Sequence, residues 1–276
     1  MSRAGKPFDW RNLRLRALSA AVLAPAVLAL MWVGSWPFLL LVAVAVALLC
    51  VEWGLMSAPR TPFRGALAIA LAVLACVFTC WLGHAALAWA LLPVAAALVA
   101  LAAALDGRER PSDAALGVLY IGAPSVALVW LRSGDVGRDW TLMMVAIAWA
   151  ADIFAFVAGN IFKGPKLWPR FSPNKTWSGL IGGLAASALA AVVVVALAKG
   201  TGDPTRGWAA VIGLIVGLFT MAGDLWESML KRRFGVKDSG QLIPGHGGLL
   251  DRVDGLMFAI VAMAGARAIA HLTGYL

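Results

Sequence analysis

The chain has 276 residues, of which 62% are hydrophobic and 13% are charged, and its mean hydropathy is +0.85. Soluble domains are usually about half apolar and about one quarter charged, so this composition excludes an ordinary soluble protein. The net charge of +9 does not indicate nucleic-acid binding, because the basic residues lie between apolar runs, as the positive-inside rule expects of a membrane protein.

The apolar runs predict the membrane-spanning segments, each close to the roughly 20 residues that such a helix needs. In chain order they cover residues 17–33, 37–53, 66–82, 86–105, 115–131, 140–159, 178–198, 208–226 and 254–272. Pro and Gly mark many of the breaks between them. The sequence therefore predicts an all-α integral membrane protein with about nine transmembrane helices.

The distribution of Lys and Arg predicts the orientation. With the N-terminus in the cytoplasm, most of the 23 Lys and Arg residues fall in cytoplasmic segments. We therefore expect a multi-pass protein of the inner (cytoplasmic) cell membrane, with its C-terminus on the opposite side. Polar residues suited to chemistry lie mainly in the C-terminal half. We expect five N-terminal spans in residues 1–135 and a catalytic region of four spans in residues 136–276, with active-site loops on the cytoplasmic face.

Acidic residues gather near the end of the eighth predicted span, in the stretch GDLWES. Asp224, Glu227 and Ser228 are spaced i, i+3 and i+4 and therefore share one helix face. Carboxylates within membrane spans are functional candidates by default. Lys231 and Arg232 follow where the helix is expected to leave the membrane, although a collar of snorkelling side chains would also explain basic residues there.

A glycine-rich stretch, IPGHGGLLDRVDG, precedes the ninth predicted span. Gly247 and Gly248 follow His246, and such a loop allows close backbone approach and can present N–H groups to an anion. Helix capping alone would explain Asp251 or Asp254. Capping does not explain why four acids gather beside basic residues at one membrane face. Paired carboxylates next to phosphate-binding groups favour Mg²⁺ holding a polyphosphate.

A second polar stretch, residues 152–183, lies between the sixth and seventh predicted spans. Asp152 falls inside a span, where a buried polar partner or a water cavity would also account for it. In SPNKTW, Ser172 and Thr176 are candidate local hydrogen-bonding residues. Lys175 lies at a helix start, where a cation opposes the helix dipole unless an anionic ligand is nearby, although it could simply set the topology. Together the two stretches predict phosphoryl or nucleotidyl transfer to a lipid.

Residues 228–254, SMLKRRFGVKDSGQLIPGHGGLLDRVD, resemble the signature of the phosphatidate cytidylyltransferase (CDP-diacylglycerol synthase) family. That signature runs Ser, two residues, Lys-Arg, four residues, Lys-Asp, then His-Gly-Gly and Asp-Arg-x-Asp. The stretches GDLWES and SPNKTW also resemble family segments. Phe156 and Ser178 stand where the family usually has Tyr and Glu. The resemblance is strong over residues 140–276 and extends to the first half by layout.

The resemblance implies that CTP and phosphatidic acid react to give CDP-diacylglycerol and pyrophosphate, with Mg²⁺; a second, monovalent cation is left open. From the chemistry of the matched residues, the expected catalytic residues are Asp224, Asp251, Lys231 and His246. The expected metal ligands are Asp224, Asp251, Glu227 and Asp254. The expected substrate-binding residues are Ser172, Lys175, Thr176, Ser228, Arg232, Lys237, Gly247, Gly248 and Arg252.

Two other readings remain open at the level of sequence. One is a related lipid kinase or a CTP transferase acting on a different lipid phosphate, and the lipid cavity would decide between phosphatidic acid and an isoprenoid phosphate. A transporter would use its acids as an ion path, but here they cluster at one face instead of being spread through the membrane. The expected partners are CTP, phosphatidic acid and the bilayer, without nucleic acid, and a homodimer is left open.

Overall fold

The computed structural model describes residues 10–197, 205–240, 242 and 247–274. Within these ranges the chain forms nine helices and one antiparallel hairpin. The helices are α1 (Trp10–Val33), α2 (Ser35–Ser57), α3 (Pro62–Trp81), α4 (Ala85–Asp106), α5 (Pro111–Arg132), α6 (Gly137–Phe162), α7 (Trp177–Leu197), α8 (Thr205–Arg233) and α9 (Leu250–Leu272). The strands are β1 (Lys166–Trp168) and β2 (Ser172–Thr176). The predicted all-helical fold is confirmed, while the hairpin between α6 and α7 was not predicted.

The helices have the length and composition of membrane spans. In the described part of the chain, α2 to α9 each contain a stretch long and apolar enough to cross a bilayer, and α1 has the shorter apolar run Ala21–Val33. Only structures that satisfy their own backbone hydrogen bonds can cross lipid, and helices do so within one segment. Large apolar side chains such as Leu71, Leu98 and Leu189 are exposed on the outside of the bundle, where they suit contact with lipid. The protein is a multi-pass membrane protein.

Helix α8 extends beyond the predicted membrane span at its C-terminal end. Its predicted span ended at residue 226, but the helix continues to Arg233. No Gly or Pro interrupts the chain between Asp224 and Arg233, and basic residues in the last turn are favourable at the negative end of the helix dipole. As a result Glu227 and Lys231 lie on one continuous helix.

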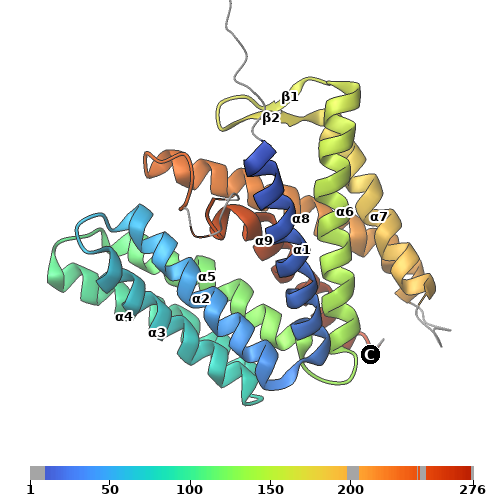
Figure 1. The fold of residues 1–276 in the computed structure, drawn as a ribbon. Helices are drawn as coiled ribbons and strands as arrows, with labels where there is room; N and C mark the ends of the chain where they lie inside the picture. The colour runs from blue at the N-terminus through green and yellow to red at the C-terminus, as the bar shows by residue number, and fades with distance from the viewer. Residues whose placement is uncertain (1–9, 198–204, 241, 243–246, 275–276) are drawn as a thin grey trace, which may run out of the picture.

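The helices pack as two groups, and the main contact between the groups is that of α5 with α9 (Figure 1). Helices α2 to α5 contact one another, and so do α6 to α9, while α1 contacts both α2 and α6. The predicted division into residues 1–135 and 136–276 stays a prediction, since packing alone does not define separate domains.

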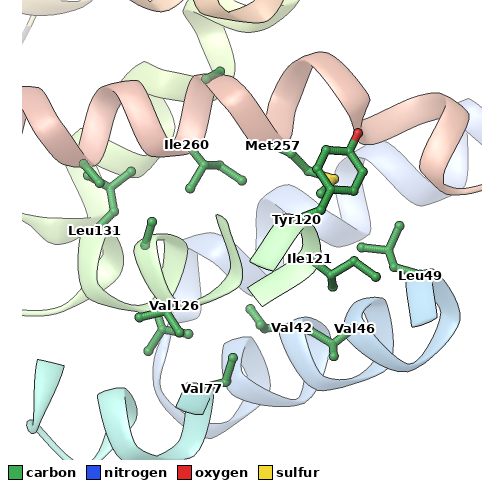
Figure 2. Close-up of a cluster of buried hydrophobic side chains, with 14 of the residues drawn as sticks. Val42, Val46, Leu49, Val77, Tyr120, Ile121, Val126, Leu131, Met257 and Ile260 are labelled. Carbon is green, nitrogen blue, oxygen red and sulfur yellow. The ribbon is translucent and has the colours of Figure 1, made fainter. Parts of the chain in front are cut away.

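Helix α5 forms the centre of the apolar core (Figure 2). Its Ile121 and Leu131 are fully buried, and among the described spans it is the one most enclosed by protein. Val46 of α2 packs in the same cluster, as does Met257 of α9. Because α5 lies between these two helices, it fixes the position of α9 relative to the N-terminal spans.

Short connections meet at one end of the bundle, which we call the loop end and define by residues 58–61, 107–110, 163–176 and 234–249, as far as they are described. There the carboxylate of Glu109 accepts the backbone N–H groups of Arg60 and Thr61 at 2.7 and 2.9 Å. At the opposite end, Arg132 donates to the carbonyl of Met31 at 2.6 Å, and Arg267 donates to that of Trp130 at 2.7 Å. Each end is thus held by polar contacts between helix termini.

Candidate active site

The acidic residues predicted on α8 lie on one face of that helix near the loop end. Asp224, Glu227 and Lys231 follow the i, i+3, i+7 spacing that brings side chains into line along a helix. The side chain of Glu227 is 2% exposed and that of Lys231 is 15% exposed. The predicted carboxylate face therefore exists; Glu227 is buried on it, while Asp224 and Lys231 are partly buried.

Lys231 connects two carboxylates from different helices. Its ammonium lies 2.6 Å from Glu227 Oε2 and 2.6 Å from Asp251 Oδ1, in the first turn of α9. Two carboxylates therefore share one cation, which leaves excess negative charge in a partly buried position. The snorkelling alternative for Lys231 is not what the structure shows, because the side chain points to acids within the protein.

The hairpin brings a second lysine to the same helix. Lys175 of β2 donates a hydrogen bond to Asp224, and both side chains are mostly buried. Asp152 of α6 is exposed and interacts electrostatically with both of them. The structure thus joins the two polar stretches of the sequence, 152–183 and 223–255, at one place.

Asp251 and Asp254 have different surroundings although both lie in the first turns of α9. Asp251 Oδ2 accepts the backbone N–H groups of Ser239 at 3.0 Å and Gly248 at 3.2 Å, while its other oxygen binds Lys231. Asp254 is half-buried and interacts electrostatically with Asp224 and Glu227. Asp251 therefore ties the loop to the helix, whereas Asp254 belongs to the carboxylate cluster.

Glycines permit the close crossing of α8 and α9 at this cluster. A Cβ at Gly255 would lie 2.6 Å from Asp224 Oδ1 and 3.0 Å from the carbonyl oxygen of Thr220. A Cβ at Gly223 would lie 3.0 Å from the Cα of Gly255. A Cβ at Gly223 would also lie 2.5 Å from the carbonyl oxygen of Asp254, and real Cβ atoms essentially never come this close to another atom, so glycine at both positions permits the close crossing of the two helices.

The described part of the glycine-rich loop has the backbone expected of it. Gly247 has a φ of 88°, in the left-handed region that favours glycine. Gly248 is buried, and a Cβ there would lie 2.9 Å from the backbone nitrogen of Gly240. His246 lies outside the described residues.

The remaining predicted binding residues differ in how far they are exposed. Ser172 and Ser228 are half-buried, and the exposed ones are Arg232, Lys237 and Arg252. Thr176 is buried, and its hydroxyl accepts the backbone N–H of Gly179 at 3.1 Å, which caps α7. The structure therefore gives Thr176 a role in holding the hairpin, whereas binding of substrate by these residues stays a prediction.

The two positions that depart from the family pattern differ in their surroundings. Phe156 is 73% exposed on α6. Ser178 accepts the backbone N–H of Gly164 at 3.2 Å, and its hydroxyl lies 3.1 Å from that of Thr176. Ser178 therefore closes the base of the hairpin, while Phe156 faces outward.

Two acids of the N-terminal spans reach this site and were not predicted. Glu52 of α2 is fully buried and binds the start of α9. Asp113 of α5 is buried and forms an ion pair with Arg233 at the end of α8. In the sequence, Glu52 could have been noticed as a carboxylate near the end of an apolar span, in the stretch VEWGLMS.

The carboxylates suit a hard cation in their chemistry, since Mg²⁺ prefers oxygen ligands and commonly uses one or two carboxylates together with phosphates. Two buried atoms, Glu227 Oε1 and the hydroxyl oxygen of Tyr120, have no hydrogen-bond partner among the described residues, and both belong to this electrostatic cluster. Within the described ranges, however, no three His, Cys, Asp or Glu side chains are arranged to hold a metal ion. Lys175 and Lys231 occupy the carboxylates that a cation would share.

Comparison with known proteins decides the family. The profile of the cytidylyltransferase family matches residues 14–269. The chain belongs to the cytidylyltransferase family. It is therefore a nucleotidyltransferase, and the lysine and carboxylate cluster is the candidate active site of this member of the family.

Two curated relatives of this cytidylyltransferase show how far the similarity extends. A protein of Brucella abortus (strain 2308) named phosphatidate cytidylyltransferase is 39% identical over 252 residues, which are 90% of each chain. A protein of the same name from Rickettsia conorii is 36% identical over 155 residues, or 55% of this chain and 67% of that one. The similarity to the Brucella protein thus includes the N-terminal spans as well as the region of the motif.

Proposed function

We propose that this cytidylyltransferase converts CTP and phosphatidic acid to CDP-diacylglycerol and pyrophosphate. An oxygen of the lipid phosphate attacks the α-phosphorus of CTP. The bond between that phosphorus and the oxygen bridging to the β-phosphate breaks, and pyrophosphate leaves. The attacking oxygen is already anionic, so the protein needs no strong general base; it must hold two anions together and offset the charge of the leaving group.

The observation that carries the proposal is the arrangement of Lys175 and Lys231, each bound to a carboxylate of α8. Two ammonium groups beside acids from α8 and α9 can hold a polyphosphate close to a lipid headgroup. The relatives named phosphatidate cytidylyltransferase support phosphatidate as the acceptor.

We assign roles to the residues on this basis. When substrates bind, the two lysines exchange their carboxylate partners for phosphate oxygens, together with Arg232 and Lys237 at the rim. Once the lysines have left their carboxylate partners, Asp224, Glu227, Asp254 and Asp251 would hold Mg²⁺. When bound, that cation supplies positive charge for the pyrophosphate leaving group. The oxygen-only donor set and the unpartnered oxygen of Glu227 support this assignment.

The loop end is proposed to face the cytoplasm, where CTP is available, in the inner membrane. Basic residues of the connecting segments concentrate at this end, as the positive-inside rule requires. This orientation places the N-terminus in the cytoplasm and the C-terminus on the opposite side. A homodimer stays a prediction that size measurements in detergent would test.

The proposal is tested by pyrophosphate release from the purified protein in detergent micelles. CTP with Mg²⁺ and phosphatidic acid should release pyrophosphate, and omitting any one of the three should stop release. ATP and an isoprenoid phosphate serve as the alternative donor and acceptor. Release only with the isoprenoid phosphate would mean that the active site is correctly assigned but the lipid substrate is not. If folded protein released no pyrophosphate with any pair of substrates, the proposed enzymatic function would be contradicted.

A matched pair of variants connects the activity to the site. Asp224→Asn should lower turnover at least about 100-fold, because it removes a charge at the centre of the cluster. Asp139→Asn is the control, since Asp139 is exposed at the opposite end of the bundle. Equal turnover in the two variants would remove Asp224 from the active site.

A further inference from the structure

Glu52 lies at the far side of the candidate active site and belongs to α2, in the N-terminal group of helices. Its side chain is fully buried. Its Oε1 accepts the backbone N–H of Leu249 at 2.7 Å, and its Oε2 accepts that of Leu250 at 2.7 Å. Oε2 also accepts the hydroxyl hydrogen of Ser239 at 3.2 Å. Both carboxylate oxygens therefore bind the glycine-rich loop or the first residues of α9.

The charge of Glu52 is offset by a helix terminus instead of a basic side chain. Among the described residues, no Lys, Arg or His forms an ion pair with Glu52 within 4.0 Å. The buried carboxylate of Asp113, in contrast, forms an ion pair with Arg233. The first N–H groups of a helix lack partners within the helix and carry partial positive charge. Glu52 thus binds the start of α9 as an anion would.

The loop backbone approaches Glu52 closely. A Cβ at Gly240 would lie 2.8 Å from Glu52 Oε1, so a larger residue at position 240 would push the loop away. The position of the Glu52 carboxylate is well defined, because α2 packs against α3 and α5. The loop is therefore positioned against the N-terminal helices and not by its own residues alone.

Ser239 connects Glu52 to the residues of the proposed reaction. Its hydroxyl binds Glu52, while its backbone N–H donates to Asp251 Oδ2 at 3.0 Å. Asp251 in turn binds Lys231. A continuous series of hydrogen bonds thus runs from Glu52 through Ser239 and Asp251 to the lysine that we assign to phosphate binding.

The other end of the same loop is also held by the N-terminal helices. Trp53, next to Glu52, packs edge-on against Phe234, the first residue after α8, with ring centroids 5.5 Å apart. Asp113 pairs with Arg233 in the last turn of α8. The N-terminal group therefore contacts the chain just before the loop and just after it.

We propose that Glu52 is a positioning residue for the nucleotidyl transfer, which it supports by fixing the start of α9 and, through Ser239, the orientation of Asp251. This assignment rests on the proposed function. It also gives the N-terminal spans a role at a site whose proposed substrate-binding and metal-binding residues all lie between positions 172 and 254. Glu52 does not touch the substrates and acts through Asp251 and the loop.

The test compares Glu52→Gln with a matched control. The amide keeps the size of the side chain but loses the charge and replaces one acceptor by a donor. The control is Glu109→Gln, because Glu109 also accepts two backbone N–H groups at a helix start on the loop end, but binds α3 and not the loop. Glu52→Gln should lower kcat about tenfold or more, with the KM for phosphatidic acid within about twofold.

Hydrogen exchange of backbone amides provides a readout that does not depend on substrate. In Glu52→Gln, exchange at residues 249 and 250 should become faster, while Glu109→Gln should affect residues 60 and 61 and leave turnover unchanged. Equal kcat in Glu52→Gln and the wild-type protein would overturn the proposal. It would also be overturned if both variants lost turnover in parallel with their thermal stability, because Glu52 would then have only a general structural role.

A second variant keeps the test decisive if Glu52→Gln does not fold. Ser239→Ala removes the hydroxyl that binds Glu52 but retains the backbone N–H that binds Asp251. It should lower kcat about threefold to tenfold, and wild-type kcat would contradict the connection through Ser239. If the wild-type protein releases no pyrophosphate with phosphatidic acid, the proposed function fails, and the exchange at residues 249 and 250 still decides the role of Glu52 in holding the loop.

Discussion

Lys231→Met tests whether one lysine holds two acids together in the candidate active site. The methionine has a similar length and no charge. It leaves Glu227, whose side chain is 2% exposed, and Asp251, which is 10% exposed, without the ammonium that lies 2.6 Å from each of them. Both carboxylates are then left without a compensating positive charge in a poorly solvated environment.

The expected magnitude follows from the cost of breaking a buried ion pair, which is about 3–5 kcal/mol when one partner is removed. At about 2–4 °C per kcal/mol for a chain of this size, the Tm should fall by about 6–20 °C. Adding Glu227→Gln should recover part of this loss. One of the two acids is then neutral, and Asp251 keeps its hydrogen bonds from Ser239 and Gly248.

The assay is thermal unfolding in detergent, followed by tryptophan fluorescence, since the chain has 13 Trp residues. Arg232→Met is the control for stability, because Arg232 is exposed on the adjacent position of α8, and its Tm should stay within about 2 °C. If Lys231→Met unfolds at the same temperature as Arg232→Met, the bridge between the two acids does not contribute to stability and the reasoning is refuted.

Three further substitutions test other parts of the site. Lys175→Ala should raise the KM for CTP about tenfold, because the hairpin loses its cation next to Asp224; steady-state kinetics measures this. Phe156→Tyr should leave turnover within about twofold, because this side chain is 73% exposed on α6. Gly255→Ala should lower turnover about tenfold or more, because its Cβ would lie 2.6 Å from the carboxylate of Asp224; Gly265→Ala on the same helix meets nothing within 4 Å and should have no effect.

Each of these substitutions has an outcome that contradicts its reasoning. Unchanged kinetics in Lys175→Ala would leave that residue as a charge that only sets the topology. A large gain or loss in Phe156→Tyr would place this position at the active site. Equal turnover in the two glycine variants would mean that the close crossing of α8 and α9 does not position the acids.

The local features of the fold followed from the sequence with good accuracy because they depend on neighbouring residues. Apolar runs predicted nine membrane-spanning helices, and the described ranges contain nine helices, of which eight are long and apolar enough to span a membrane. The predicted span ended at residue 226, where hydropathy falls, whereas helix formation depends on propensity and capping and continues to Arg233. The hairpin was missed because its strands have only three and five residues, too few for a periodic pattern.

The sequence by itself also determined the chemical character of the site. The acids of residues 224–254, the glycines and the lysines were recognised from residue type and spacing, and the structure brings Asp224, Lys231 and Asp251 into one cluster with Lys175. Only the tertiary structure decided which charges are paired. Lys175 and Asp224 are 49 positions apart, and Lys231 and Asp251 are 20 apart, so no helical periodicity connects them.

The largest gap between sequence and structure concerns the N-terminal spans. Glu52 lies 198 positions from Leu250, and Asp113 lies 120 positions from Arg233, yet both acids bind the helix ends that carry the active-site residues. A pattern of hydrophobicity shows that a segment crosses the membrane, but not which helix it packs against or which terminus its carboxylate reaches. Composition and spacing determined the helices and the chemistry of their residues, whereas the packing of α5 between α2 and α9 decided that Glu52 meets the start of α9.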